Sequence, residues 1–224
     1  MNYQLKNNIA ILSFDDGKAN AVGHEYLDNI NAGLDRAEAE KAGAVILRGR
    51  EGLFSGGFDL AEFKKGNEAG LAMVKRGFEL LIRLYSLPLP VVAACTGHGV
   101  AMGAFIIMTC DMRIGCRGAF KLRLPETAIG MDLPPILVAL TASCISIRHL
   151  TRVALQSQSY NPDQAVDAGF LDEVVEVDEL DERALAVAQQ LSELPQTQYA
   201  ANKLLIRSKT IQAMKDGLIQ MEMK

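Results

Sequence analysis

Short apolar segments alternate with longer amphipathic segments in the first half of the chain, and this alternation limits the fold more than any other feature. Residues 8–14 (NIAILSF), 44–49 (AVILRG) and 91–95 (VVAAC) have the apolar composition of buried strands. Residues 24–41 and 68–86 place apolar side chains at helical spacing. Strands that alternate with helices favour a mostly parallel α/β core.

The second half of the chain predicts fewer strands. Residues 112–116, 119–122 and 172–177 have the composition of short strands, and most of the rest has a helical pattern. We therefore expect an α/β core over residues 1–134 and a helical C-terminal part over residues 135–224, both within one structural unit.

Composition argues against several classes of function. The formal net charge is −4 and no run of Lys or Arg exceeds a pair, so a nucleic-acid partner is not expected. The longest apolar stretch, residues 99–110, is far shorter than the ~20 residues that cross a bilayer, so no membrane span is expected. The four cysteines form no CxxC pair and no Cys/His metal spacing, so we expect free thiols, no metal site and a reducing, cytoplasmic location.

Two glycine-rich segments follow two of the predicted strands. FSGGFDL (54–60) comes after the strand at 44–49, and GHGVAMG (97–103) comes after the strand at 91–95 as a loop that enters a helix. If the two strands are neighbours in a parallel sheet, both segments lie at its carboxyl edge, where ligands bind. Free N–H groups at two such helix starts can converge on one oxygen and form an oxyanion hole.

Two other interpretations of the glycines stay open. Gly97, Gly99 and Gly103 follow a strand and open a helix, as in a dinucleotide site, but their spacing is not GxGxxG and two strands and two helices precede them. Alternatively, the glycines serve only the close packing of a helix on a strand.

Five sequence segments occur in one order over about residues 4–210. They are GKANAVG (17–23), FSGGFDL (54–60), VVAAC with GHGVAMGAFIIMTCD (91–95 and 97–111), AFKLRLPETAIGM (119–131) and YNPDQAVDAGFLDEVV (160–175). Together they resemble the crotonase superfamily, the enoyl-CoA hydratases and isomerases. The resemblance implies an α/β fold, a spiral of ββα turns with a helical C-terminal region, and an acyl-CoA thioester as the substrate.

The resemblance also implies which residues contact that substrate. The backbone N–H groups of Phe58 and Met102 match the pair that holds the thioester oxygen, with an uncertainty of one position between Met102 and Gly103. Family members usually carry glycine at the Met102 position. Coenzyme A is part of the substrate, so no separate cofactor is expected. Further contacts are expected beside the thioester and pantetheine from Asp59, Leu60 and Ala61, and beside the adenosine from Lys18, Ala19 and Ala21.

The acidic residues decide which reaction the resemblance favours. Hydratases of the family divide the addition of water between two glutamates; the later one matches Glu126 in LPETAIG, whereas the earlier one matches Phe105. A double-bond shift needs only one carboxylate, which removes a proton from C2 and returns it at C4. Asp132 is a weak candidate for a second acid, because the position that supplies one in related dienoyl-CoA isomerases matches Pro134.

The sequence therefore predicts a Δ3,Δ2-enoyl-CoA isomerase with Glu126 as acid and base. The alternatives are an enoyl-CoA hydratase of fatty acid β-oxidation and an acyl-CoA-binding protein with little catalysis. The family forms trimers or pairs of trimers, so a homotrimer or dimer of trimers is expected. The sequence ends at Lys224, earlier than in typical members, and one terminal helix is expected to be missing. Acyl length and pathway do not follow from the sequence.

Overall fold

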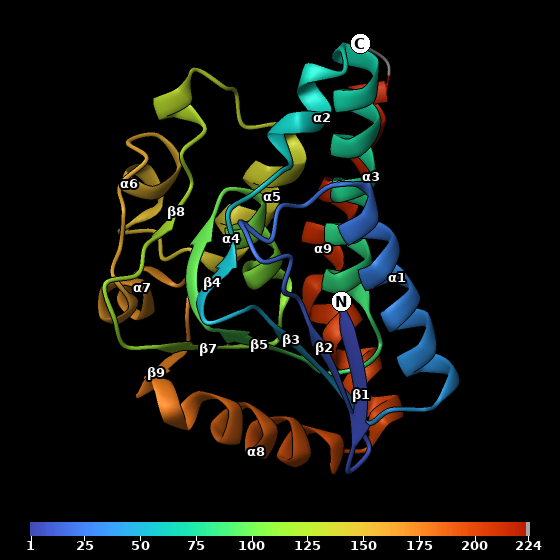
Figure 1. Ribbon diagram of the computed structural model, residues 1–224. Coiled ribbons are helices and arrows are strands. Elements are labelled where there is room, and N and C mark those ends of the chain that lie inside the picture. Colours follow the sequence, from blue (N-terminus) through green and yellow to red (C-terminus); the bar gives the residue numbers. More distant parts are fainter. Residues whose placement is uncertain (223–224) are drawn as a thin grey trace.

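The computed structural model describes residues 1–222, and within them the centre of the molecule is a six-stranded main sheet (Figure 1). Its strand order is β1-β2-β3-β5-β7-β9; β1 and β2 pair antiparallel, and every other neighbouring pair is parallel. The predicted α/β core is confirmed. The strands of the main sheet are β1 (Asn2–Lys6), β2 (Ile9–Ser13), β3 (Ala44–Arg48), β5 (Val91–Cys95), β7 (Met112–Cys116) and β9 (Glu173–Val175).

Helices cover both faces of the main sheet. Helix α8 (Leu180–Ser192) packs against one face and lies beneath the sheet in Figure 1. The opposite face forms the larger core together with the remaining long helices. Burial on both faces explains why β2, β3 and β5 are almost continuously apolar in sequence, whereas the edge strand β1 is polar and mostly exposed. The other helical segments are α1 (His24–Ala39), α2 (Leu60–Lys64), α3 (Asn67–Ser86), α4 (Met102–Thr109), η1 (Thr127–Ile129), α5 (Pro135–Cys144), α6 (Leu150–Ala154), α7 (Pro162–Ala168), η2 (Val177–Glu179) and α9 (Gln196–Glu222).

A second, smaller sheet carries the segments that were expected to be functional. Its strands are β4 (Gly52–Ser55), β6 (Gly97–Val100) and β8 (Leu122–Arg123), in the order β4-β6-β8, and both neighbouring pairs are parallel. The chain passes from β3 to β4 to α2, from β5 to β6 to α4, and from β7 to β8 to η1. This repeat is the ββα spiral implied by the resemblance.

Three sequence predictions differ from the structure at this small sheet. The segment at Gly97–Val100 was expected to be a loop and is a strand. The strand Gly52–Ser55 was not predicted, and the strand expected at 119–122 is Leu122–Arg123. The physical reason is close approach of backbones: a Cβ added to Gly97 would lie 2.0 Å from the carbonyl carbon of Gly52. Glycine usually weakens a strand, but here only glycine allows β4 and β6 to pair.

The C-terminal helix α9 is fixed to the core by a buried cluster of charges. Lys203 Nζ lies 2.6 Å and an Arg207 Nη 3.0 Å from the Asp111 carboxylate, and Lys203 also donates to the Leu89 carbonyl at 3.1 Å. Asp111 therefore joins α9 to the end of the segment that contains β6 and α4.

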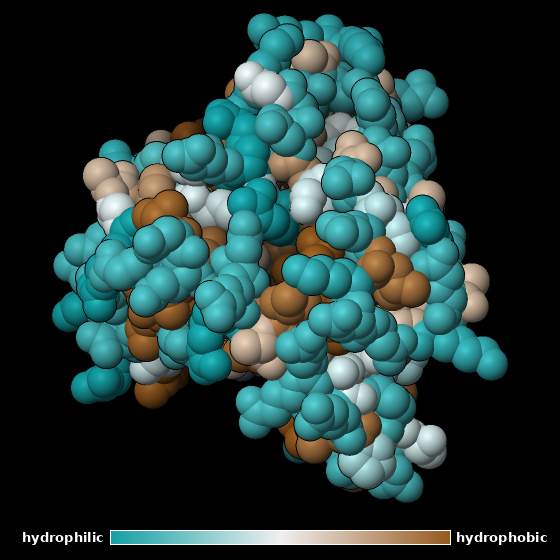
Figure 2. Space-filling view, turned by 60° about the horizontal axis from the view of Figure 1, so that its bottom comes forward, coloured by the Kyte–Doolittle hydropathy of each residue, from teal (hydrophilic) through white to brown (hydrophobic). Residues whose placement is uncertain are grey.

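The surface is mostly hydrophilic on the face that Figure 2 shows, with hydrophobic residues in separate groups, one of them in a hollow near the middle of the view. Within residues 1–222, no helix combines the length and the apolar character that spanning a membrane requires.

Candidate active site

The parallel strands of the small sheet bring three distant segments to one edge. β4 leads into Phe58, β6 leads into Met102, and β8 leads into Glu126. Because β6 is the central strand of this sheet, the chain that leaves it at Met102 lies between the chains that leave β4 and β8. The Ala101 N–H donates to the Arg123 carbonyl at 3.0 Å, which fixes β6 beside β8 up to their ends. The three residues expected to act on the substrate thus begin at the same edge of one sheet.

The turn before Phe58 exposes its amide. Gly57 has a φ of +106°, a conformation that favours glycine. The backbone on both sides of Phe58 is bonded to Val22: the Val22 N–H donates to the Gly57 carbonyl at 2.8 Å and the Asp59 N–H donates to the Val22 carbonyl at 3.2 Å. The Phe58 N–H itself meets no hydrogen-bond acceptor in the described chain. Its ring packs on α3, where a Cβ at Gly77 would lie 2.6 Å from it.

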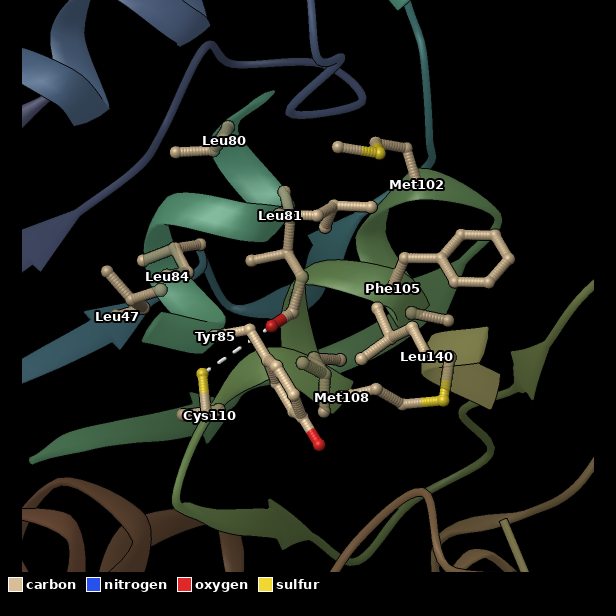
Figure 3. Packing of buried hydrophobic residues seen from close by; sticks show 14 of the residues in the cluster. Leu47, Leu80, Leu81, Leu84, Tyr85, Met102, Phe105, Met108, Cys110 and Leu140 are labelled. Carbon is tan, nitrogen blue, oxygen red and sulfur yellow. Dashed lines mark hydrogen bonds between the residues drawn. The ribbon is translucent and has the colours of Figure 1, made fainter. Parts of the chain in front are cut away.

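The amide of Met102 is free in the same way. Met102 is the first residue of α4, and its N–H has no acceptor among residues 1–222, as expected for a first helical turn. Ala101 precedes it with φ +51° and ψ −124°, an unusual backbone conformation for a residue with a side chain. A Cβ placed on Gly57 would lie 3.6 Å from the Met102 nitrogen, so the two free amides border one small space. The Met102 side chain is 1% exposed and lies in the core (Figure 3).

Glu126 is a buried carboxyl group, and one of its two oxygens has no hydrogen-bond partner in the described part of the chain. The residue is 7% exposed, and Oε2 makes no hydrogen bond in the described part of the chain. Burial raises the pKa of Glu126; the residue's own backbone N–H and the positive charge of Arg123 oppose this rise. A carboxyl with a raised pKa can both accept and donate a proton near neutral pH.

The turn that carries Glu126 is held by the end of α6 and by the connection between α6 and α7. Thr127 Oγ1 donates to the Ala154 carbonyl at 3.1 Å, and the Ala128 N–H donates to Ser157 Oγ at 3.2 Å. Arg123 Nε donates to the Ser157 carbonyl at 2.6 Å. These contacts were not predicted, because a serine in a polar stretch gives no sequence signal for a distant hydrogen bond.

Helix α4 supplies no second acid. All eight of its residues are buried, and none has a side chain that carries a charge. Phe105 is the residue that the resemblance matches to the earlier glutamate. In Figure 3 Phe105 projects from α4 near Leu140 of α5 and points away from Leu80 and Leu84 of α3. The next acid along the chain, Asp111, is paired with the two cations of α9.

The segment expected beside the adenosine lies against the Phe58 loop. The Gly56 N–H donates to the Ala19 carbonyl at 2.9 Å, and Ser55 Oγ donates to the Asn20 carbonyl at 2.8 Å. Arg50 Nε donates to the Lys18 carbonyl at 2.9 Å.

Lys18 and Ala19 are exposed and Ala21 is half-buried. This short segment is therefore accessible and immobilised next to the first free amide.

The remaining predicted contact residues have different surroundings. Asp59 caps α2 by accepting the Ala61 N–H at 2.8 Å, and Leu60 is 71% exposed at the start of that helix. A Cβ on Gly103 would lie 2.5 Å from the Ser55 carbonyl oxygen, so this glycine allows α4 to approach β4.

A cavity of about 990 Å³ opens beside the turn that follows Glu126. It lies between this turn, α5, α6 and the end of α9. Asp132 lines it as an exposed loop residue; the cap position of α5 belongs to Pro134. Over residues 1–222, no three His, Cys, Asp or Glu side chains gather as a metal site. The other lining residues include Thr127, Val138, Leu155 and Met221.

Comparison with known proteins identifies the family and the fold. The model of a family described as enoyl-CoA hydratase/isomerase matches residues 4–223. The mitochondrial enoyl-CoA delta isomerase 1 of Rattus norvegicus is 28% identical over 206 residues, which cover 90% of this chain and 71% of that protein.

Solved structures carry both activity names. The apo structure of an enoyl-CoA isomerase of Mycobacterium tuberculosis is 34% identical with a TM-score of 0.95, and the match covers 100% of this chain and 97% of that one. A second structure of the same M. tuberculosis protein, described there as a probable enoyl-CoA hydratase, is 35% identical with a TM-score of 0.93, and the match covers 97% of this chain and 92% of that one.

Proposed function

This chain belongs to the enoyl-CoA hydratase/isomerase family, and from that premise we propose that it moves the double bond of a 3-enoyl-CoA to the 2-position. Two features together carry the proposal: Glu126 is a buried carboxyl whose Oε2 makes no hydrogen bond, and Phe105, an apolar residue, matches the position where a hydratase has its other glutamate. One acid is sufficient for a proton to move between two carbons, whereas addition of water benefits from two.

The proposed reaction uses Glu126 twice. As a carboxylate it removes a proton from C2, and the electron pair of that C–H bond enters a dienolate whose negative charge rests on the thioester oxygen. The N–H groups of Phe58 and Met102 donate to this oxygen. Each such donor typically contributes 10²- to 10³-fold to the rate. The protonated Glu126 then returns the same proton to C4, which leaves the double bond between C2 and C3 and regenerates the carboxylate.

We place the bound substrate along the same edge of the small sheet. Asp59, Leu60 and Ala61 would contact the thioester and pantetheine, and Lys18, Ala19 and Ala21 the adenosine of coenzyme A. Lys18 is exposed and Arg50 lies next to it, so positive charge is available for the phosphates of the ligand. Coenzyme A enters as part of the substrate, and the reaction draws on no other cofactor. We also propose that copies of this chain assemble as a trimer or a pair of trimers. Light scattering tests this by measuring the molar mass of the assembly.

Replacing Glu126 by glutamine tests the proposed base. With a 3-enoyl-CoA as substrate, we expect Glu126→Gln to lower kcat by about 10²- to 10⁴-fold, because an amide cannot accept the C2 proton. Glu182→Gln, an exposed position on α8, is the control and should keep full turnover. Unchanged turnover by Glu126→Gln would remove this residue from the mechanism.

A hydratase activity is the second candidate, because Asp132 lines the cavity beside the Glu126 turn. Incubation of a 2-enoyl-CoA with the protein, followed by chromatography for 3-hydroxyacyl-CoA, separates the two activities. If Asp132 is the second acid, hydration is present and Asp132→Asn abolishes it. If the isomerase proposal holds, 3-hydroxyacyl-CoA is formed far more slowly than the double bond is shifted.

A further inference from the structure

Ser157 has an unusual conformation in the connection between α6 and α7. It is 3% exposed and has a φ of +49°, in the left-handed region that residues with side chains disfavour. A strained backbone at a buried position persists only where surrounding contacts hold it in place.

The contacts of Ser157 lie on both sides of Glu126. Its hydroxyl oxygen accepts the Ala128 N–H at 3.2 Å, and its carbonyl accepts Arg123 Nε at 2.6 Å. Ala128 is two residues after Glu126 and Arg123 three residues before it. A single residue therefore fixes the chain that enters and the chain that leaves the proposed base.

The hydrogen bond to Ala128 has a specific consequence for Glu126. Glu126 is the N-cap residue of the short helix η1, and Ala128 is the second residue of that helix. The side chain of an N-cap residue, most often Ser, Thr, Asp or Asn, can accept the N–H of the second or third helical residue. Here the Glu126 side chain makes no such bond, and the Ser157 hydroxyl accepts this N–H instead.

We propose that Ser157 is a positioning residue: by satisfying the Ala128 N–H, it keeps the Glu126 carboxylate from folding back as a helix cap and leaves it free for the substrate. The inference rests on the proposed function, in which Glu126 is the base. It predicts that loss of the hydroxyl lets the carboxylate turn onto its own helix, away from the reacting carbons.

Two substitutions separate positioning from stability. Ser157→Ala and Ser157→Gly both remove the hydroxyl, but glycine adopts a positive φ without strain, so the glycine variant should have the higher Tm. We expect both variants to lower kcat on a 3-enoyl-CoA by the same factor, about 10- to 100-fold, with KM changed less than about twofold. A merely structural role would make kcat follow Tm.

Ser157→Asn and Ser159→Gly complete the set. Asparagine tolerates a positive φ and offers a side-chain oxygen, so Ser157→Asn should recover part of the lost kcat. Ser159 is exposed two residues away, and its hydroxyl makes no hydrogen bond in the described chain, so Ser159→Gly should behave as the parent protein.

Hydrogen exchange of the Ala128 amide supplies a readout that needs no turnover. We expect faster exchange in Ser157→Ala and Ser157→Gly, and no change in Ser159→Gly. Unchanged exchange, or a Ser157→Gly variant with the kcat of the parent protein, overturns the inference. If the parent protein shows no turnover but substitution of Ser157 still speeds exchange of the Ala128 amide, the isomerase proposal is overturned. The contact between Ser157 and Ala128 is then still established.

Discussion

Gly57 sets the distance between the two free amides of the proposed oxyanion hole. A Cβ at this position would lie 3.0 Å from the Ala101 Cβ and 3.6 Å from the Met102 nitrogen, in a residue with φ +106°. We expect Gly57→Ala to lower kcat on a 3-enoyl-CoA by about 10²-fold or more, because the added methyl group crowds the space in front of the Met102 amide.

Gly66 offers a matched control for this substitution. Its φ is +128°, and a Cβ there would meet nothing within 4 Å. Gly66→Ala should therefore lose about 1–2 kcal/mol of stability from backbone strain and keep its kcat. Equal kcat values for Gly57→Ala and Gly66→Ala, measured beside their thermal unfolding, would refute the role of the Gly57 turn.

The burial of Glu126 makes a prediction about stability. Because burial raises its pKa, the folded protein keeps a proton on this carboxyl over a pH range in which the unfolded chain has lost it. The free energy of unfolding then falls as pH rises from the ordinary glutamate pKa to the raised pKa of Glu126. Glu126→Gln should remove this fall and be more stable than the parent protein at neutral pH, by on the order of 1 kcal/mol.

Urea unfolding at about pH 5 and about pH 8 measures this effect. The stability difference between Glu126→Gln and the parent protein should be larger at the higher pH. Glu182→Gln, on the exposed side of α8, should show no such trend. A difference that does not depend on pH would mean that burial has not raised the pKa of Glu126.

At the scale of elements, the sequence predicts the main sheet well and the small sheet poorly. β3 and β5 are almost entirely apolar on both faces, so composition alone identifies them. β6 reads GHGV, and its pairing depends on the fit of Gly97 against the β4 backbone, which no local pattern encodes. The motifs around Glu126 and Phe58 are visible in the sequence, whereas Ser157 acts through a contact that only the folded chain creates.

Helix α9 depends on the charge cluster at Asp111. The Lys203 side chain is 4% exposed and that of Asp111 is 9% exposed, so water cannot solvate either charge well. Asp111→Ala leaves two cations without their carboxylate, and we expect it to lower the free energy of unfolding by about 3–5 kcal/mol. Glu173→Ala breaks a more exposed pair, with Arg183, and should cost less than about 1 kcal/mol.

Urea unfolding of both variants measures the difference. A loss for Asp111→Ala as small as that for Glu173→Ala would show that this cluster does not hold α9 to the core.

At the scale of the whole molecule, the ββα spiral explains how one binding edge is built from distant parts of the chain. Each turn of the spiral adds one strand to the main sheet and one to the small sheet, and the small-sheet strands deliver Phe58, Met102 and Glu126 in succession. The C-terminal part contributes β9 to the main sheet, α8 to the cover of one sheet face, and the end of α9 to the wall of the cavity. The proposed site is therefore a property of the complete spiral.

Following a deuterium label from C2 tests the central claim most directly. A 3-enoyl-CoA in which both hydrogens at C2 are replaced by deuterium is incubated with the protein, and the product is analysed by NMR. If Glu126 alone moves the proton, the product is 2-enoyl-CoA with deuterium at C4, because a carboxyl that is 7% exposed exchanges slowly with water. A product without label at C4, 3-hydroxyacyl-CoA as the main product, or no loss of label from C2 would contradict the single-carboxylate isomerase.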